Sequence, residues 1–163
     1  MRYKYLLTMM LFPLSIYVHA QSLQTWTWDT YKIKFKAPDN LVVQINDATV
    51  YEAGNNNMYL DIYPRKRENL TYDGMKNAIV KWANSLHLSY NTTNSSGNTQ
   101  PIYLKDINGY WGCAIDGTSK GLPATVMLIV NPDDPELSFY IWINYAEEYY
   151  HDAVAILRSF TPM

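Results

Sequence analysis

Two segments in the second half of the chain are apolar on both faces of the strands that they are expected to form. Residues 124–130 carry almost only hydrophobic side chains, and residues 137–145 set a hydrophobic row against an aromatic one. Successive side chains of a strand point to opposite sides of its sheet, so both faces of these strands need cover. The pattern predicts a sheet enclosed between two further layers.

Two amphipathic helices are expected to supply those layers. One apolar stripe at helical spacing lies within residues 72–86, with Thr71 as the expected N-cap. This stripe consists of Met75, Ala78, Ile79, Trp82, Ala83 and Leu86. Residues 147–159 carry two adjacent apolar lines, with His151 and Asp152 on the polar side. The two lines are Tyr149, Ala153, Ile156 and Phe160, and Tyr150, Val154 and Leu157. The sequence thus predicts an α+β fold, a three-layer α/β/α sandwich around a mainly antiparallel twisted sheet.

Alternation and turn residues mark the remaining strands. Residues 31–36 alternate apolar side chains with lysine, and we interpret this basic stripe as protection of a sheet edge against pairing with another chain. Because Gly and Asn accept positive φ, residues 54–57 and the Asn108-Gly109 pair predict hairpin turns. Residues 89–100 are rich in Asn, Ser, Thr and Gly, and are expected to form a long loop that buries nothing.

The first residues have the features of an export signal. A basic start, an apolar run and a small-residue site that ends at Ala20 follow the order that signal peptidase recognises. Residues 1–20 are therefore expected to be removed, leaving residues 21–163 as a single globular domain, periplasmic or extracellular. An uncleaved anchor is the alternative, but Pro13 interrupts a run shorter than the roughly 20 apolar residues that a spanning helix needs. No transmembrane segment is expected after cleavage.

Residues with catalytic or metal-binding chemistry form no recognisable motif. Cys113 is the only cysteine, and its place on one strand face with Trp111 and Ile115 favours a buried, inert thiol over a nucleophile. His87 and His151 lack the spacing of zinc ligands. We therefore expect no catalytic residue, no metal and no cofactor. After removal of the leader, 11 Lys and Arg stand against 15 Asp and Glu, and this mild acidity argues against nucleic acid as a partner.

The two ends of the expected domain resemble a known group. The opening strand Tyr31-Lys32-Ile33-Lys34-Phe35-Lys36-Ala37-Pro38 and the closing Ala155-Ile156-Leu157-Arg158-Ser159-Phe160, with the order of elements between them, look like the PsbP-like superfamily. The resemblance implies an α/β/α sandwich that docks onto a larger protein or assembly. Because members of this group are not generally enzymes, it supplies no catalytic residues for this chain.

Tyrosine is the most distinctive component of the expected mature chain, with 12 of its 143 residues. Tyrosine suits recognition surfaces because it is rigid and amphipathic, although Tyr59 and Tyr63 could instead pack beneath a helix. The loop at residues 89–100 has the mixture that adaptable binding loops use, which also describes an idle loop. Candidate binding residues are Tyr59, Tyr63, Tyr90, Asn91, Asn94 and Asn98.

The leading functional hypothesis is a secreted or periplasmic, non-catalytic binding or docking module. Its partner is expected to be a protein or another component of the cell envelope of a bacterium. One alternative is a small hydrolase whose site is assembled from scattered Asp, His and Tyr side chains and so leaves no motif. Another is an inhibitor or immunity protein for a secreted toxin. The sequence leaves these alternatives open, together with the oligomeric state.

Overall fold

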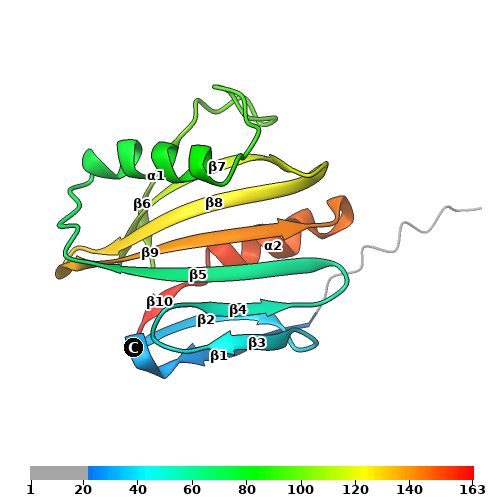
Figure 1. Cartoon of the computed structure of the whole chain (residues 1–163), viewed down its shortest axis with the longest axis horizontal. Helices are drawn as coiled ribbons and strands as arrows, with labels where there is room; N and C mark the ends of the chain where they lie inside the picture. The colour runs from blue at the N-terminus through cyan, green and yellow to red at the C-terminus, as the bar shows by residue number, and fades with distance from the viewer. Residues whose placement is uncertain (1–21) are drawn as a thin grey trace, which may run out of the picture.

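The computed structural model describes residues 22–163, so the predicted signal peptide lies outside the described residues. Two antiparallel sheets make up most of the fold (Figure 1). The larger one has seven strands in the order β3-β4-β5-β9-β8-β7-β6. Their bounds are β3 Val42–Asn46, β4 Tyr51–Gly54, β5 Met58–Lys66, β6 Ile102–Ile107, β7 Tyr110–Ser119, β8 Leu122–Asn131 and β9 Asp134–Tyr145. The smaller sheet has the order β1-β2-β10, with β1 Leu23–Trp28, β2 Ile33–Pro38 and β10 Thr161–Pro162.

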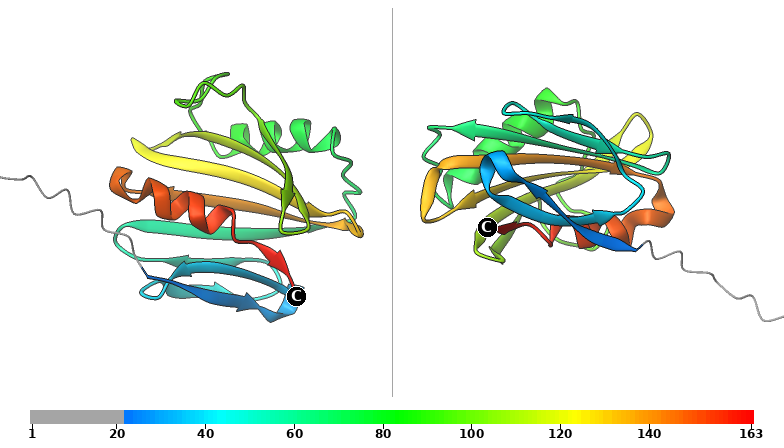
Figure 2. Two further views of the ribbon diagram at one scale, coloured as in Figure 1. Left: turned by 180° about the vertical axis from the view of Figure 1, so that it is seen from behind. Right: turned by 90° about the horizontal axis from the view of Figure 1, so that it is seen from below.

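Three layers confirm the predicted sandwich. Helix α1 (Gly74–Ser85) covers β7 and β8 on one face of the large sheet. Helix α2 (Tyr150–Leu157) contacts β9 and β2 on the opposite face, where the small sheet also lies (Figure 2). The small sheet is an addition that the sequence did not predict. No helix within residues 22–163 is long and apolar enough to cross a membrane.

Two hydrophobic cores lie on either side of the large sheet and share β8 and β9. Val126, Leu128 and Tyr140 face α1, whereas Met127 and Ile141 face α2 and the small sheet. The α1 stripe behaves as predicted, with Met75, Ile79 and Ala83 buried and Ala78, Trp82 and Leu86 partly buried against the same core. Strands that are apolar on both faces therefore form the middle layer, as the sequence indicates.

The lysine stripe on β2 is exposed, but the edge interpretation is wrong. β2 lies between β1 and β10, so it is the central strand of the small sheet. Ile33 and Phe35 are buried in the core, while Lys34 and Lys36 face solvent. A one-sided strand has this alternation whether it is central or at an edge, and the strands that flank β2 come from the two ends of the described chain.

Both predicted hairpin turns occur, and one forms by a different mechanism. Asn108 and Gly109 adopt φ of 50° and 100°, as expected. The turn from β4 to β5 instead uses the Asn55 side chain, whose Oδ1 accepts hydrogen bonds from the backbone N–H of Asn57 at 2.8 Å and of Met58 at 3.0 Å. Gly54 is needed there because a Cβ atom would lie 2.6 Å from the Tyr59 ring.

The helix ends differ in detail from the prediction. The N-cap of α1 is Asp73 rather than the predicted Thr71, although the Thr71 hydroxyl accepts a hydrogen bond from the N–H of Gly74 at 3.1 Å. At the last helix, residues Glu147–Tyr149 form a 3-10 turn before α2 begins. Asp152 is buried and Tyr150 is 41% exposed, so the predicted polar face is wrong for Asp152 and the predicted apolar line is wrong for Tyr150. A 3-10 turn has about three residues per turn instead of 3.6. The buried face of α2 therefore differs from the one predicted for an uninterrupted α-helix over residues 147–159.

Candidate functional site

The loop at residues 89–100 is tied to the far end of β7. Ser89 and Thr118 exchange two backbone hydrogen bonds, at 2.9 and 2.8 Å. This approach requires the neighbouring Gly117, because a Cβ atom there would lie 2.4 Å from the Ser89 carbonyl oxygen. The sequence contains this glycine but does not indicate which loop residue it approaches.

Gln100 holds the other end of the loop. Its side chain is 8% exposed, and its Nε2 donates to the carbonyl oxygens of Asn91 and Asp116, both at 2.9 Å. The N–H of Asp116 donates back to Gln100 Oε1, while Asn94 Nδ2 donates to Asp116 Oδ2 at 3.1 Å. The expectation that this loop buries nothing is therefore wrong for Gln100, whose amide replaces backbone pairing that the loop lacks.

A groove of about 750 Å³, here called the loop groove, separates this loop from the residues that follow β9. Three of the predicted site residues, Tyr90, Asn91 and Asn94, line it. Asn98 does not line the groove, although its N–H donates to Asn94 Oδ1 at 2.9 Å. The opposite wall contains Tyr145, Tyr150, His151, Glu147 and Glu148. Within the described residues, the lining includes carboxylates and aromatic rings but no Lys or Arg.

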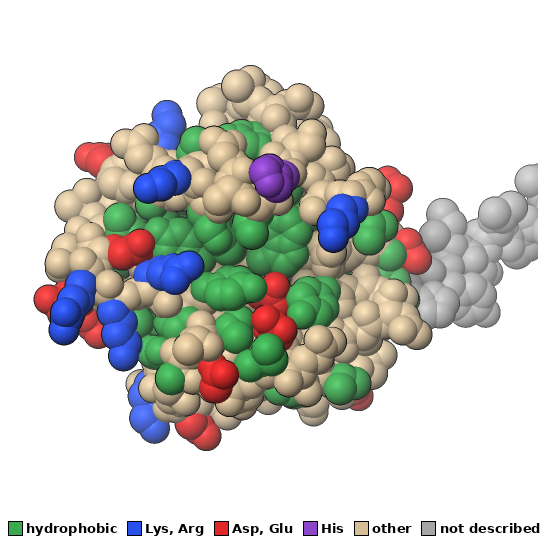
Figure 3. Space-filling model, in the orientation of Figure 1, with side chains coloured by type: hydrophobic (Ala, Val, Ile, Leu, Met, Phe, Trp, Pro, Cys, Tyr) green, Lys and Arg blue, Asp and Glu red, His purple; other side chains and the backbone are tan. Residues whose placement is uncertain are grey.

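The other two predicted residues, Tyr59 and Tyr63, lie elsewhere. They belong to the part of the α1 side that lies at and beyond the border of α1, here called the open sheet face: Ile45, Glu52, Tyr59, Asp61, Tyr63 and Trp142. Glu52 pairs across the strands with Asp61, and Asp61 pairs with Trp142. Figure 3 shows this side of the molecule, with acidic side chains enclosed by hydrophobic ones near its centre. The structure thus divides the predicted site between two places.

The Asp61 carboxyl group is the least satisfied polar group of the open sheet face. Asp61 is 8% exposed, and its Oδ2 accepts a hydrogen bond from the Tyr63 hydroxyl at 3.3 Å. Its Oδ1 is buried and has no hydrogen-bond partner among the described residues. Desolvation, and then the negative charge of Glu52, raise the pKa of Asp61 to about 7. Glu52 in turn accepts a hydrogen bond from the Tyr59 hydroxyl at 3.1 Å.

Sequence reasoning missed Asp61 and Glu52. The available signal was the alternation Tyr59, Asp61, Tyr63 on the strand face opposite Met58, Leu60 and Ile62. The alternation places the Asp61 carboxylate between two aromatic rings on one strand face, where few polar groups surround it. Such a position indicates a candidate site. The partner of Asp61 on β4 could not be identified from sequence, since cross-strand neighbours depend on the register.

The remaining candidates for chemistry are structural or exposed. Cys113 is fully buried, and desolvation raises the pKa of its thiol to about 12, which opposes thiolate formation. His151 lines the loop groove, and His87 is exposed just after α1. Within residues 22–163, no three His, Cys, Asp or Glu side chains are grouped so that they could hold a metal ion.

Comparisons with known proteins identify a shared fold. No family model and no curated protein matches the chain. The crystal structure of the Ran-binding protein Mog1p from Saccharomyces cerevisiae aligns with a TM-score of 0.58 at 9% identity, over 88% of this chain and 96% of that one. A protein of Bacteroides thetaiotaomicron aligns at 0.48 and 10% identity, over 81% of this chain and 45% of its own length. The likeness to Mog1p shows that this chain has the same α+β sandwich fold.

Proposed function

We propose that this chain is an exported, non-catalytic docking module of the PsbP-like type that binds a basic segment of a partner protein through the open sheet face. Aromatic side chains without a covering element are typical of the central part of a protein interface. Tyr59, Tyr63 and Trp142 are each half-buried on this face. Tyr63 and Trp142 pack at the border of the core beneath α1, where the Tyr63 ring meets the Trp82 ring edge-on with centroids 6.3 Å apart, whereas Tyr59 lies outside that core. A partner would complete the layer that α1 leaves unfinished.

The charge of the open sheet face selects the partner's chemistry. Asp61 and Glu52 are cross-strand neighbours, and the negative charge of Glu52 raises the cost of ionising Asp61 because like charges repel. An Arg or Lys side chain of a partner would relieve that repulsion and offer donors to the carboxylates. The observation that carries the proposal is this pair of neighbouring acidic groups, of which Asp61 is buried, inside a half-buried aromatic surface. The protein-binding name of Mog1p, a Ran-binding protein, agrees with a docking role for this fold.

Affinity measurements on surface variants test the docking proposal. A partner captured from a cell-envelope extract is identified and purified, and its dissociation constant is measured for the wild type, Tyr63→Ala and Glu52→Lys. Each change should weaken binding by about tenfold or more, because central aromatic and charged contacts dominate interface energies. Tyr150→Ala is the matched control, since Tyr150 is an exposed tyrosine that lines the loop groove instead. Loss of binding in the control, with Tyr63→Ala unaffected, would place the interface in the loop groove and reject the open sheet face.

The export part of the proposal rests on the leader and is tested separately. The intact mass of protein recovered from the native host should correspond to a chain that begins at Gln21. A mass that still includes residues 1–20 would contradict signal cleavage without affecting the docking surface.

A hydrolase is the second candidate, and the Asp61–Glu52 pair is the observation in its favour. Paired carboxyl groups with unlike protonation are the usual acid and base of glycoside hydrolysis. If this is the function, chromogenic glycosides should be hydrolysed by the wild type, and Asp61→Asn should reduce the rate by at least about 100-fold. Equal rates for the wild type and Asp61→Asn would exclude this pair as a catalytic one.

A further inference from the structure

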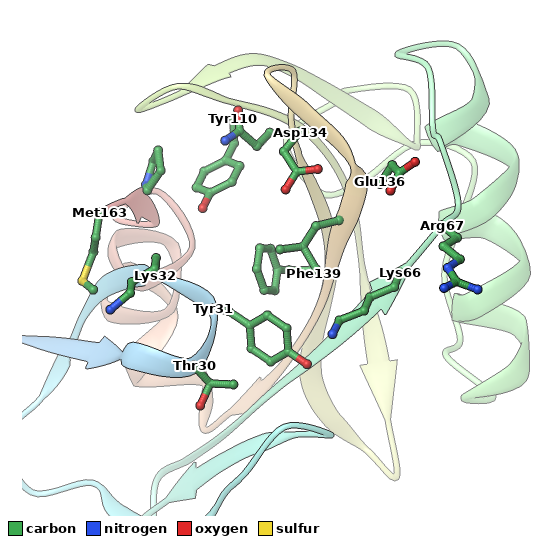
Figure 4. Close-up of a pocket in the computed structure, with 13 residues that line it drawn as sticks. Thr30, Tyr31, Lys32, Lys66, Arg67, Tyr110, Asp134, Glu136, Phe139 and Met163 are labelled. Atoms are coloured by element: carbon green, nitrogen blue, oxygen red, sulfur yellow. The ribbon is translucent and has the colours of Figure 1, made fainter.

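A cavity of about 500 Å³, here called the hairpin cavity, lies on the other side of the molecule from α1, where the β8–β9 hairpin meets the start of β2 (Figure 4). Its volume is in the range of pockets for small molecules. The ring of Phe139 forms its apolar floor, and Tyr31 and Tyr110 flank that ring. Phe139 and Tyr110 are 1% and 3% exposed, and Tyr31 contacts Phe139 edge-on with ring centroids 5.8 Å apart. These contacts fix the floor before any ligand arrives.

Opposite charges stand at two sides of that apolar floor. The Lys66 ammonium lies over the Tyr31 ring, with Nζ 5.6 Å from the ring centroid. Figure 4 shows the Asp134 carboxylate on the opposite side of Phe139, next to Tyr110. Among the described residues, neither Lys66 nor Asp134 is held in an ion pair. Desolvation raises the pKa of Tyr110 to about 12, so its hydroxyl keeps its proton and stays a hydrogen-bond donor at the cavity wall.

Other charged residues line the outer part of the cavity. They leave a positive charge on the Lys66 side of Phe139 and a negative charge on the Asp134 side. Figure 4 shows Arg67 beyond Lys66 and Lys32 on the far side of Tyr31. Glu136 lies next to Arg67, and the Arg67 N–H donates to the Glu136 carbonyl oxygen at 2.7 Å. The Lys66 end therefore has an additional cation, whereas Asp134 remains the carboxylate that faces the floor.

We propose that the hairpin cavity binds a short peptide with free termini, its ammonium group at Asp134 and its carboxylate at Lys66, with an apolar side chain on Phe139. The proposed site is separate from the open sheet face and does not depend on the docking function. The chemical class follows from the two unpaired, opposite charges and the apolar surface between them.

The separation of the two charges distinguishes peptides from single amino acids. A compact cavity of about 500 Å³ is about 8 to 10 Å across, and an extended chain spans about 3.5 Å per residue. A dipeptide or tripeptide therefore reaches both ends of the cavity. A free amino acid has its ammonium and carboxylate on one carbon atom and could engage only one end at a time.

Calorimetric titration of the full chain with Leu-Leu tests the proposal, with N-acetyl-Leu-Leu and Leu-Leu amide as blocked probes. We expect the free dipeptide to bind at least about threefold more tightly than either blocked probe, since each block removes one charged contact. Asp134→Asn should weaken binding of Leu-Leu and leave the affinity for N-acetyl-Leu-Leu unchanged. Lys66→Gln should weaken binding of Leu-Leu and leave the affinity for Leu-Leu amide unchanged, because the amide lacks the carboxylate that Lys66 would bind.

Matched controls keep the experiment decisive. Lys105→Gln and Asp106→Asn change the same residue types at exposed positions on β6, outside the cavity, and should bind all probes as the wild type does. Unchanged melting temperatures for Asp134→Asn and Lys66→Gln would show that the affinity changes are not the result of unfolding. Absence of binding at millimolar Leu-Leu, or equal affinities for free and blocked probes, would overturn the proposal.

Discussion

Asp61 has a carboxyl group in surroundings that favour its neutral form. Its pKa is raised from the ordinary 3.8 to about 7, chiefly by desolvation and then by Glu52. Between these two values the folded protein holds a proton that the unfolded chain has released. The stability contributed by this group is therefore present at low pH and is lost as the pH rises through about 7.

Asp61→Asn removes this titration and should change how stability depends on pH. The difference in free energy of unfolding between variant and wild type should move in the variant's favour from about pH 4 to pH 7. The total should be about 2–4 kcal/mol, because one pKa unit corresponds to about 1.4 kcal/mol. Above about pH 7 the difference should level off. Urea unfolding across this pH range measures it, and parallel curves for the two proteins would show that the Asp61 carboxyl is not desolvated.

The thiol of Cys113 is expected to be unreactive in the folded protein. It is fully buried in the core with Ile115, and desolvation keeps it in the thiol form. The native protein should therefore resist a thiol reagent and react only in denaturant. Cys113→Ala should reduce the free energy of unfolding by roughly 1–2 kcal/mol, through a small cavity. Fast labelling of the native protein would reopen the interpretation of Cys113 as a nucleophile.

Among the elements, α2 links the two sheets. Its Ile156 and Leu157, and Phe160 after it, are buried with Ile141 and Ile143 of β9. Phe160 also stacks on Phe35 of β2, with ring centroids 5.1 Å apart. The apolar face of β9 thus has the cover that its sequence requires, and this cover comes from the last part of the chain.

Truncation after Ala146 should expose that face and leave an insoluble or molten product. Loss of near-UV circular dichroism and strong binding of a hydrophobic dye, with far-UV circular dichroism retained, would identify the molten state. Removal of Met163 alone is the control, since this residue is 50% exposed, and should leave the melting curve unchanged. If the chain truncated at Ala146 stayed soluble and melted cooperatively, α2 would not be needed to cover β9.

The sequence allowed prediction of elements whose burial repeats along the chain. Helix α1 and strand β9 each have a period that fits one kind of structure, and β8 is a short apolar run between turn residues, so the predicted faces of all three agree with the cores. The errors lie where a residue's partner is distant. Gln100 is buried because Asp116 accepts and donates hydrogen bonds with it, and Lys34 lies on a central strand because β10 returns beside it. Neither contact has a local signal.

The same limit applies to the candidate site. Tyr90, Asn91 and Asn94 were predicted from loop composition and do line one groove, because they are neighbours in the sequence. Tyr59 and Tyr63 share the alternation of a single strand and lie together for the same reason. Other elements supply further residues at each place. Glu52 of β4 lies on the open sheet face, and the residues after β9 form the opposite wall of the loop groove. Cross-strand register and loop closure bring them there, and neither can be derived from one sequence.

At the scale of the whole molecule, one core connects the two sheets. The cluster between them includes Trp28 and Phe35 from the small sheet, Leu60 and Ile141 from the large sheet, and Phe160 after α2. The first and last strands of the described chain lie in the same small sheet, since β1 and β10 pair with β2 on its two sides. Because a sheet of three short strands cannot bury its apolar face alone, the small sheet should not fold or unfold independently.

This shared core predicts a single cooperative transition for the whole protein. Phe35→Ala removes the ring that stacks on Phe160 and contacts Tyr51 edge-on at 5.4 Å, and should lower the free energy of unfolding by roughly 3–5 kcal/mol. Phe35 belongs to the small sheet, whereas most of the strand signal in far-UV circular dichroism comes from the large sheet. Because one core joins the two sheets, the unfolding transitions seen by circular dichroism and by tryptophan fluorescence should both shift to the same lower denaturant concentration. Lys34→Ala changes the neighbouring residue, whose side chain lies on the exposed face of the same strand, and should change the midpoint of unfolding very little. An early transition seen by fluorescence alone in Phe35→Ala would mean that the small sheet opens separately, and that the large sheet with α1 is the unit that holds the fold.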